Sequence, residues 1–119
     1  MVTVEQLRAW AMAFTEVTEA PHFEKTSFRV RKKIFCTVDV QKRSVVLKLN
    51  EQDQSVFCAY DSEAVYPVAG AWGKKGWTTF ELSTTHKDLF TDALNVAYCT
   101  VAPKKLAILH RPPEDDFTL

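Results

Sequence analysis

The chain has 119 residues, the size of one domain, so we expect a single compact unit with one core. Hydrophobic residues make up 46% and charged residues 25%, which excludes a disordered, collagen-like or disulfide-scaffold protein. No apolar run approaches the ~20 residues that span a bilayer, and the first residues do not follow the pattern of a secretory signal. We therefore expect a cytoplasmic protein without a membrane partner.

Charge is unevenly distributed along a chain that is neutral overall. Fifteen basic and fifteen acidic side chains cancel, so the domain-wide positive charge typical of many nucleic-acid-binding domains is absent. Residues 25–48 nevertheless hold eight Lys and Arg against the single Asp39, whereas residues 1–24 hold one Arg and four Glu. This basic quarter of the chain is the only electrostatic indication of a partner.

The first expected element is a helix that runs to about Ala20. Thr3 and Gln6 have the spacing of a capping box, and apolar residues from Val4 onward recur at intervals of three and four. Pro21 fixes its own φ angle and lacks an N–H group, so it is expected to stop the helix.

Three strands are expected next, because apolar and polar residues alternate over residues 27–31, 34–40 and 44–49. Residues 32–33 and 41–43 are the expected turns between them. Short polar turns between adjacent strands predict a meander.

A short helix is expected from Asn50, which has Asp53 three residues later, to about Ala59. Residues 65–68 are expected to form an edge strand, because Pro67 has no N–H group for a central ladder.

All three glycines, Gly70, Gly73 and Gly76, fall within seven residues. They indicate a bent loop or hairpin tip, and their spacing without a following helix does not match a phosphate-binding loop. A strand at residues 77–82 follows, and then a helix capped by Thr85 and ended by Pro103.

These elements predict an α+β two-layer sandwich, with an antiparallel sheet of about five strands and the N- and C-terminal helices packed on one face. The expected order is α-β-β-β-α-β-β-α. Residues 1–106 are the expected single domain, and residues 107–119 are expected to be an acidic, flexible C-terminal tail.

Several motifs, taken in order, resemble the MmcQ/YjbR family over roughly residues 1–106. They are the run Pro21-His22-Phe23-Glu24-Lys25-Thr26-Ser27-Phe28-Arg29-Val30, then Lys33-Ile34-Phe35, Val46-Leu47-Lys48-Leu49, Trp72 with Gly76-Trp77, Ala97-Tyr98, and Ala102-Pro103-Lys104-Lys105. The resemblance implies a frataxin-like (CyaY-like) fold. It also implies a role as a DNA-binding protein of the "double wing" type.

Basic side chains at three expected turns, together with two on the sheet between them, form the candidate DNA surface. Hairpin tips project beyond a sheet and can contact phosphates, and an aromatic side chain beside the glycines can stack on bases of a single strand. The candidate nucleic-acid-binding residues are Arg29, Arg31, Lys32, Lys33, Lys42, Arg43, Lys48, Lys74, Lys75 and Trp72. We expect weak, largely electrostatic and non-specific or weakly specific binding, weakened by reversing Arg31, Lys32 and Lys33 to Glu.

The same basic residues allow two other interpretations. Lysine-rich turns are common on solvated surfaces, and the same face would also suit a module that binds a protein or a small anion. We expect the protein to be a monomer in either case.

Metal binding and catalysis are not expected. Carboxylates of the first segment, at Glu5, Glu16, Glu19 and Glu24, are too dispersed for a hard-cation site. His22, His86 and His110 are the only imidazoles and none lies beside a cysteine in sequence, while Cys36 and Cys99 fall on faces expected to be buried. We expect no metal, no cofactor and no enzymatic activity.

Overall fold

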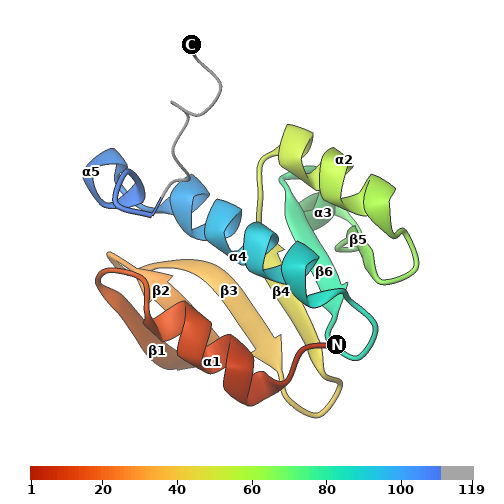
Figure 1. Ribbon diagram of the computed structural model, residues 1–119, viewed down its shortest axis with the longest axis horizontal. Helices are drawn as coiled ribbons and strands as arrows, with labels where there is room; N and C mark the ends of the chain where they lie inside the picture. The colour runs from red at the N-terminus through yellow and green to blue at the C-terminus, as the bar shows by residue number, and fades with distance from the viewer. Residues whose placement is uncertain (111–119) are drawn as a thin grey trace.

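The alternating segments of the sequence form one antiparallel sheet in the computed structural model, which describes residues 1–110 (Figure 1). The predicted α+β two-layer fold is confirmed, with six strands in the order β1-β2-β3-β4-β6-β5 in place of about five. The strands are β1 (Val17–His22), β2 (Lys25–Val30), β3 (Lys33–Asp39), β4 (Ser44–Lys48), β5 (Val65–Pro67) and β6 (Trp77–Glu81).

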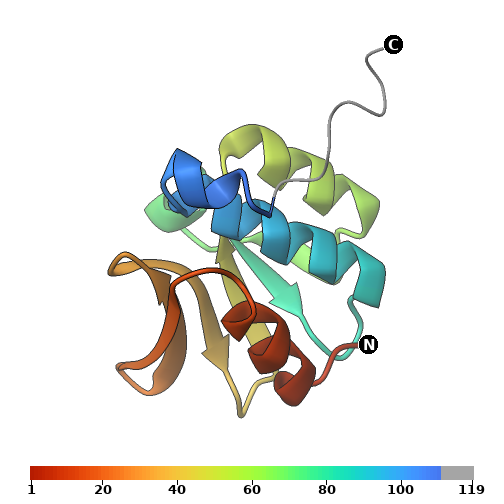
Figure 2. The same ribbon diagram turned by 60° about the vertical axis from the view of Figure 1, so that its left-hand side comes forward.

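Two amphipathic helices cover one face of this sheet: the N-terminal helix and the helix before Pro103 (Figures 1 and 2). Within residues 1–110 no helix is long and apolar enough to cross a membrane. The helices are α1 (Val4–Met12), α2 (Glu51–Tyr60), α3 (Ala71–Lys74), α4 (Lys87–Val101) and α5 (Lys104–Ala107).

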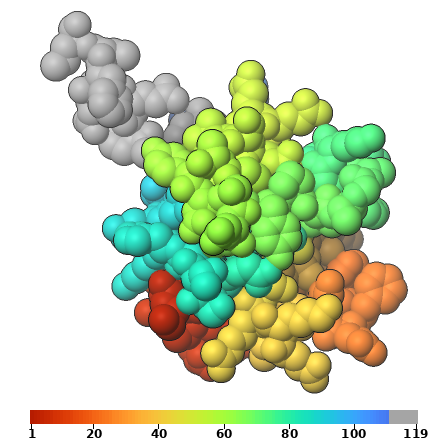
Figure 3. Space-filling model, turned by 90° about the vertical axis from the view of Figure 1, so that its right-hand side faces the viewer, coloured from red at the N-terminus to blue at the C-terminus, as the bar shows by residue number. Residues whose placement is uncertain are grey.

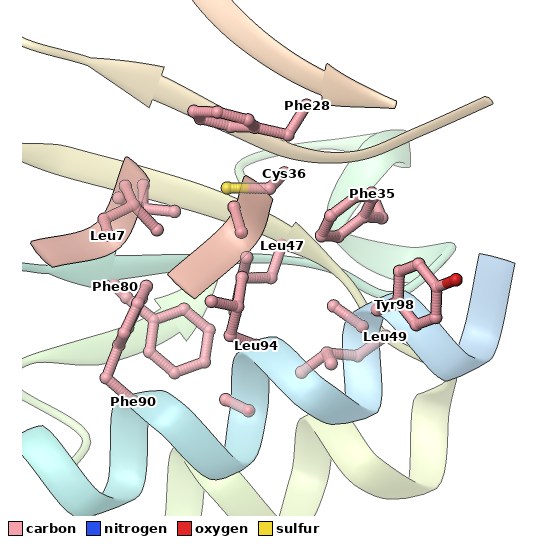
Figure 4. Close-up of a cluster of buried hydrophobic side chains, with 14 of the residues drawn as sticks. Leu7, Phe28, Phe35, Cys36, Leu47, Leu49, Phe80, Phe90, Leu94 and Tyr98 are labelled. Atoms are coloured by element: carbon pink, nitrogen blue, oxygen red, sulfur yellow. The ribbon is translucent and has the colours of Figure 1, made fainter. Parts of the chain in front are cut away.

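The core lies between α4 and the strands (Figure 4). Tyr98 of α4 packs edge-on against Phe35 of β3 at 5.5 Å, and Phe90 packs edge-on against Phe80 of β6 at 5.8 Å. These side chains are fully buried, and each such burial contributes about 1.5–3 kcal/mol to folding. The apolar alternation of the sequence therefore faces the helical layer, and the opposite sheet face mixes polar residues with half-buried apolar ones such as Val46 and Trp77.

The first helix is shorter than predicted. The capping box of Thr3 and Gln6 is present, but α1 ends at Met12. Glu16 adopts a φ of 62° and reverses the chain, so that residues predicted as helix form the edge strand β1. Pro21 fits there because an edge strand leaves one row of N–H groups unpaired.

The turn between β2 and β3 consists of Arg31 and Lys32, one residue earlier than predicted. Both have positive φ angles, 51° and 70°, the geometry of a two-residue hairpin loop that normally selects Asn or Gly. Lys33 already pairs with Val30 as the first residue of β3.

Two other local predictions need correction. The glycine segment contains the short helix α3, not only a bent loop. His86, not Thr85, caps α4 with Nδ1 accepting from the N–H of Asp88, while buried Thr85 donates its hydroxyl to the carbonyl of Glu81.

The packed structure also extends past residue 106. Ala107 is buried in α5, and the His110 ring packs 5.0 Å from Phe14 and 5.2 Å from Tyr98. Residues 111–119, the rest of the predicted tail, lie outside the described residues.

Candidate nucleic-acid interface

The sheet divides into two wings at one end. The ladder between β3 and β4 runs from the pair Asp39–Ser44 to the pair Cys36–Leu47, and the two strands diverge beyond it (Figures 1 and 2). We call strands β1 to β3 the first wing. The second wing consists of β4, β6 and β5 with α3.

A groove with a volume of about 860 Å³ lies between these wings. Thr37 and Val46, which are paired neighbours on β3 and β4, line it, and so do Thr100 and Val101 at the end of α4. Figure 3 shows the β1–β2 segment, in orange, and the α3 region, in green, projecting on the same side with a recess between them. The volume of the groove is at the upper end of the range for small-ligand sites.

Basic side chains from both wings line the groove. They are Lys25, Arg29, Lys32, Lys33 and Lys48, and no Asp or Glu occurs among the described residues that line it. Arg29 is held in place because its Nε donates to the hydroxyl of Ser27 at 3.0 Å. Lys48 donates its ammonium group to the carbonyl of Lys75. These contacts orient two cations without neutralising them, so the groove carries a local excess of positive charge.

Aromatic side chains accompany the cations. Phe23, at the tip of the β1–β2 hairpin, is 93% exposed, and Trp72 on α3 is 61% exposed. Trp77 meets Trp72 edge-on, with ring centroids 6.1 Å apart. The Lys48 ammonium lies 5.6 Å from the Trp77 ring centroid, and that of Lys75 lies 5.7 Å from the Trp72 centroid.

Close packing fixes the position of α3 and hence of Trp72. The side-chain amide of Gln54, on α2, donates to the carbonyl of Gly73 at 2.9 Å and to the hydroxyl of Thr78 at 3.1 Å. A Cβ atom at Gly73 would lie 1.9 Å from the carbonyl oxygen of Val68. Only glycine at position 73 therefore allows α3 to pack this closely against Val68, the residue that follows β5.

The predicted site residues divide into those that line the groove and those that do not. Arg29, Lys32, Lys33, Lys48 and Trp72 line it. Lys75 borders it through its contacts with Trp72 and Lys48, and Lys74 is exposed on α3 beside Trp72.

Three other predicted cations lie elsewhere. Lys42 and Arg43 belong to the turn between β3 and β4, at the opposite end of these strands from Lys33 and Lys48. Arg31 is in an ion pair with Glu16, with Nε 2.6 Å from a carboxylate oxygen.

The Glu16–Arg31 pair changes the electrostatics of both partners. Arg31 donates two hydrogen bonds to the carboxylate, the second at 3.1 Å. This hydrogen bonding lowers the pKa of Glu16 and raises the pKa of Arg31. The charge of Arg31 is thus partly neutralised by Glu16, whereas its neighbours Lys32 and Lys33 line the groove.

Lys25, His22 and Phe23 line the groove but are missing from the sequence-based site. They were assigned to the segment after a long first helix, so the β1–β2 hairpin that carries them was not recognised. The pair His22–Lys25 closes this hairpin. The local signal is weak: Val17 and Thr18 are adjacent β-branched residues, which favour a strand over a helix.

Features that suggest metal or thiol chemistry lie apart from the groove. Within residues 1–110 no three His, Cys, Asp or Glu side chains are grouped so that they could hold a metal ion. Glu16 and Glu19 are each paired with an arginine. Cys36 is buried as expected, and burial raises the pKa of its thiol far above the usual value, whereas Cys99 is only half-buried.

The fold and groove together define a small α+β domain with a split antiparallel sheet and a cationic, aromatic-lined site. The YjbR family model matches residues 12–100, and the chain belongs to the YjbR family. The resemblance seen in the sequence is therefore confirmed.

Two examples of solved structures show the same fold. A Deinococcus radiodurans protein, DR2400, described with the domain DUF419, has a TM-score of 0.77 at 20% identity, covering 96% of this chain and 91% of that one. A Pseudomonas syringae protein has a TM-score of 0.62 at 12% identity, covering 84% of this chain and 99% of that one. No curated protein sequence matches the chain. At these identities the likeness shows the fold alone.

Proposed function

We propose that the protein binds DNA without catalysing a reaction on it, holding phosphates in the groove between the two wings. The observation that carries this proposal is the convergence of five cations from three strands and one turn on a groove without a lining carboxylate. Phosphate contacts made by Lys and Arg supply most of the affinity of non-specific DNA binding.

The local distribution of charge supports this proposal, although the net charge of the protein does not. The chain is neutral overall, so attraction to DNA depends on a local field and not on net charge. The β2–β3 turn contributes Lys32 to this local field, whereas its neighbour Arg31 is paired with Glu16.

The test compares two charge-reversal variants with the same change in charge. Lys32→Glu/Lys33→Glu alters the groove, whereas Lys42→Glu/Arg43→Glu alters the turn at the other end of the strands. The pairs are matched, because each contains one residue at positive φ, Lys32 at 70° and Arg43 at 53°. Fluorescence anisotropy of labelled DNA, at about 50 mM and 200 mM salt, gives affinity and salt dependence for each variant.

We expect salt-dependent binding by the wild type, a large loss in the groove variant and little change in the control variant. A loss of comparable size in both variants would mean that binding follows overall charge and not the groove. Absence of binding to single-stranded and duplex DNA at low salt would overturn the proposed function.

A further inference from the structure

We propose that the groove takes single-stranded DNA in preference to duplex, with unpaired bases stacked on Phe23 of the first wing and Trp72 of the second. This inference rests on the proposed function and specifies the form of its ligand. It follows from the aromatic side chains, which electrostatic attraction to phosphates does not require.

The exposure and the backbone conformation of Phe23 are both unfavourable for a large apolar residue. Its side chain is 93% exposed and its φ angle is 59°, a conformation that is a genuine outlier for a bulky residue. Its ring contacts that of His22 edge-on, with 4.8 Å between the centroids. An apolar ring that is both exposed and strained adds little to stability, but it leaves its faces available to a ligand.

Trp72 is also exposed, but unlike Phe23 it lies on a helix that close packing holds in place. Gln54 and the tight approach of Gly73 to Val68 hold α3 in place, yet the Trp72 side chain is 61% exposed. A fixed backbone with an exposed indole ring is suited to stacking, because little conformational entropy remains to be lost on binding.

Cations lie close to the aromatic rings in and beside the groove. Lys25 follows Phe23 by two residues, and Lys48 and Lys75 lie over the rings of Trp77 and Trp72. A single strand offers unpaired base faces and a phosphate at each nucleotide, which matches aromatic and cationic groups in turn. In a duplex the base faces are already stacked on each other, so Phe23 and Trp72 would gain no stacking partner.

The test uses labelled oligo-dT and a hairpin duplex of equal phosphate number, with affinities measured by anisotropy. The variants are Phe23→Ala and Trp72→Ala, with Trp72→Phe as the conservative rescue. Tyr60→Ala is the matched control, because Tyr60 is also a highly exposed aromatic residue, at 76%, but lies on α2 and does not line the groove.

We expect the wild type to bind the single strand more tightly than the hairpin. Phe23→Ala and Trp72→Ala should each weaken single-strand binding by about fivefold or more, with little change on the hairpin. Trp72→Phe should restore most of the loss, and Tyr60→Ala should change neither affinity. Circular dichroism melting curves verify that each variant is folded.

Two results would overturn this inference and leave the proposed function intact: equal or tighter binding to the hairpin, or single-strand affinity unchanged in both alanine variants while salt-dependent binding persists. A protein that binds neither ligand would lose both the inference and the proposed function. The charge-reversal variant separates these cases, because Lys32→Glu/Lys33→Glu should weaken binding to any DNA form.

Discussion

The carboxylate of Glu16 holds the guanidinium of Arg31 at two points, with Nε 2.6 Å from one oxygen and Nη2 3.1 Å from the other. Glu16 lies in the reversal between α1 and β1, and Arg31 lies in the turn between β2 and β3. The pair therefore connects the two ends of the β1–β2 hairpin to each other on the surface of the first wing, where Val17 pairs with Val30.

The pair predicts a pH-dependent difference in stability. Because hydrogen bonding to Arg31 lowers the pKa of Glu16 in the folded state, its contribution is present at neutral pH and is lost as the pH falls through that lowered value. Glu16→Gln should therefore be less stable than the wild type at about pH 7 and equal to it in strong acid. Urea denaturation midpoints measure the difference, and Glu63→Gln, at an exposed loop position, is the control.

The same pair predicts that Arg31 contributes little to DNA binding. Lys33 lines the groove, whereas Arg31 is engaged by Glu16. Lys33→Ala should reduce the slope of log affinity against log salt by about 0.7–0.9, the value for one phosphate contact. Arg31→Ala should leave that slope nearly unchanged. Equal slopes for the two variants would show that the ion pair opens when DNA binds.

A third prediction concerns the support beneath Trp72. The Gln54 amide donates to the carbonyl of Gly73, the carbonyl of Trp77 and the hydroxyl of Thr78. Gln54→Ala leaves these partly buried acceptors without that donor, and we expect a loss of about 1–3 kcal/mol in unfolding free energy. Single-strand affinity should fall too, because α3 is no longer fixed. Gln52→Ala, an exposed change on the same helix, is the control for helix propensity.

Local sequence patterns predicted the elements wherever the physical cause is local. The capping box at Thr3, the cap at Asn50 and the edge strand containing Pro67 are confirmed, because each depends on residues within a few positions. The end of α1 was missed because Glu16 adopts a left-handed conformation that no glycine marks. Burial of Val17 at the start of β1 outweighs the helical preference that the spacing of apolar residues indicates.

The groove could be predicted only in part, because convergence of side chains depends on strand pairing. Lys33 and Lys48 were identified from charge, but their position on facing wings follows from the early end of the β3–β4 ladder. Charge alone also predicts Arg31 as a site residue, because its partner Glu16 is fifteen residues away in a segment that the sequence predicts as helix. The sequence shows where cations occur along the chain, but only the folded structure shows which of them are paired with a carboxylate.

A fourth prediction compares two glycines of the α3 segment. A Cβ at Gly73 would lie 1.9 Å from a backbone oxygen, whereas Gly70 has open space around it but a φ of 78°. Gly70→Ala should cost about 1–2 kcal/mol through backbone strain alone. Gly73→Ala should cost more, because α3 must move away from Val68 before the methyl group fits. Thermal melting of the two variants checks the order, and the reverse order would contradict the close approach.

The last prediction concerns His110, which anchors the chain beyond α5. Its Nε2 lies 3.1 Å from the N–H of Thr15 and accepts a hydrogen bond from it, and its ring packs edge-on against both Phe14 and Tyr98, which stack on each other. His110→Ala removes this packing and leaves a half-buried N–H without its acceptor, so we expect a loss of about 1–3 kcal/mol. Leu109→Ala, a change at an exposed neighbour, should be nearly neutral. Denaturation midpoints distinguish the two, and equal stability of both variants would mean that the domain does not depend on contacts past residue 106.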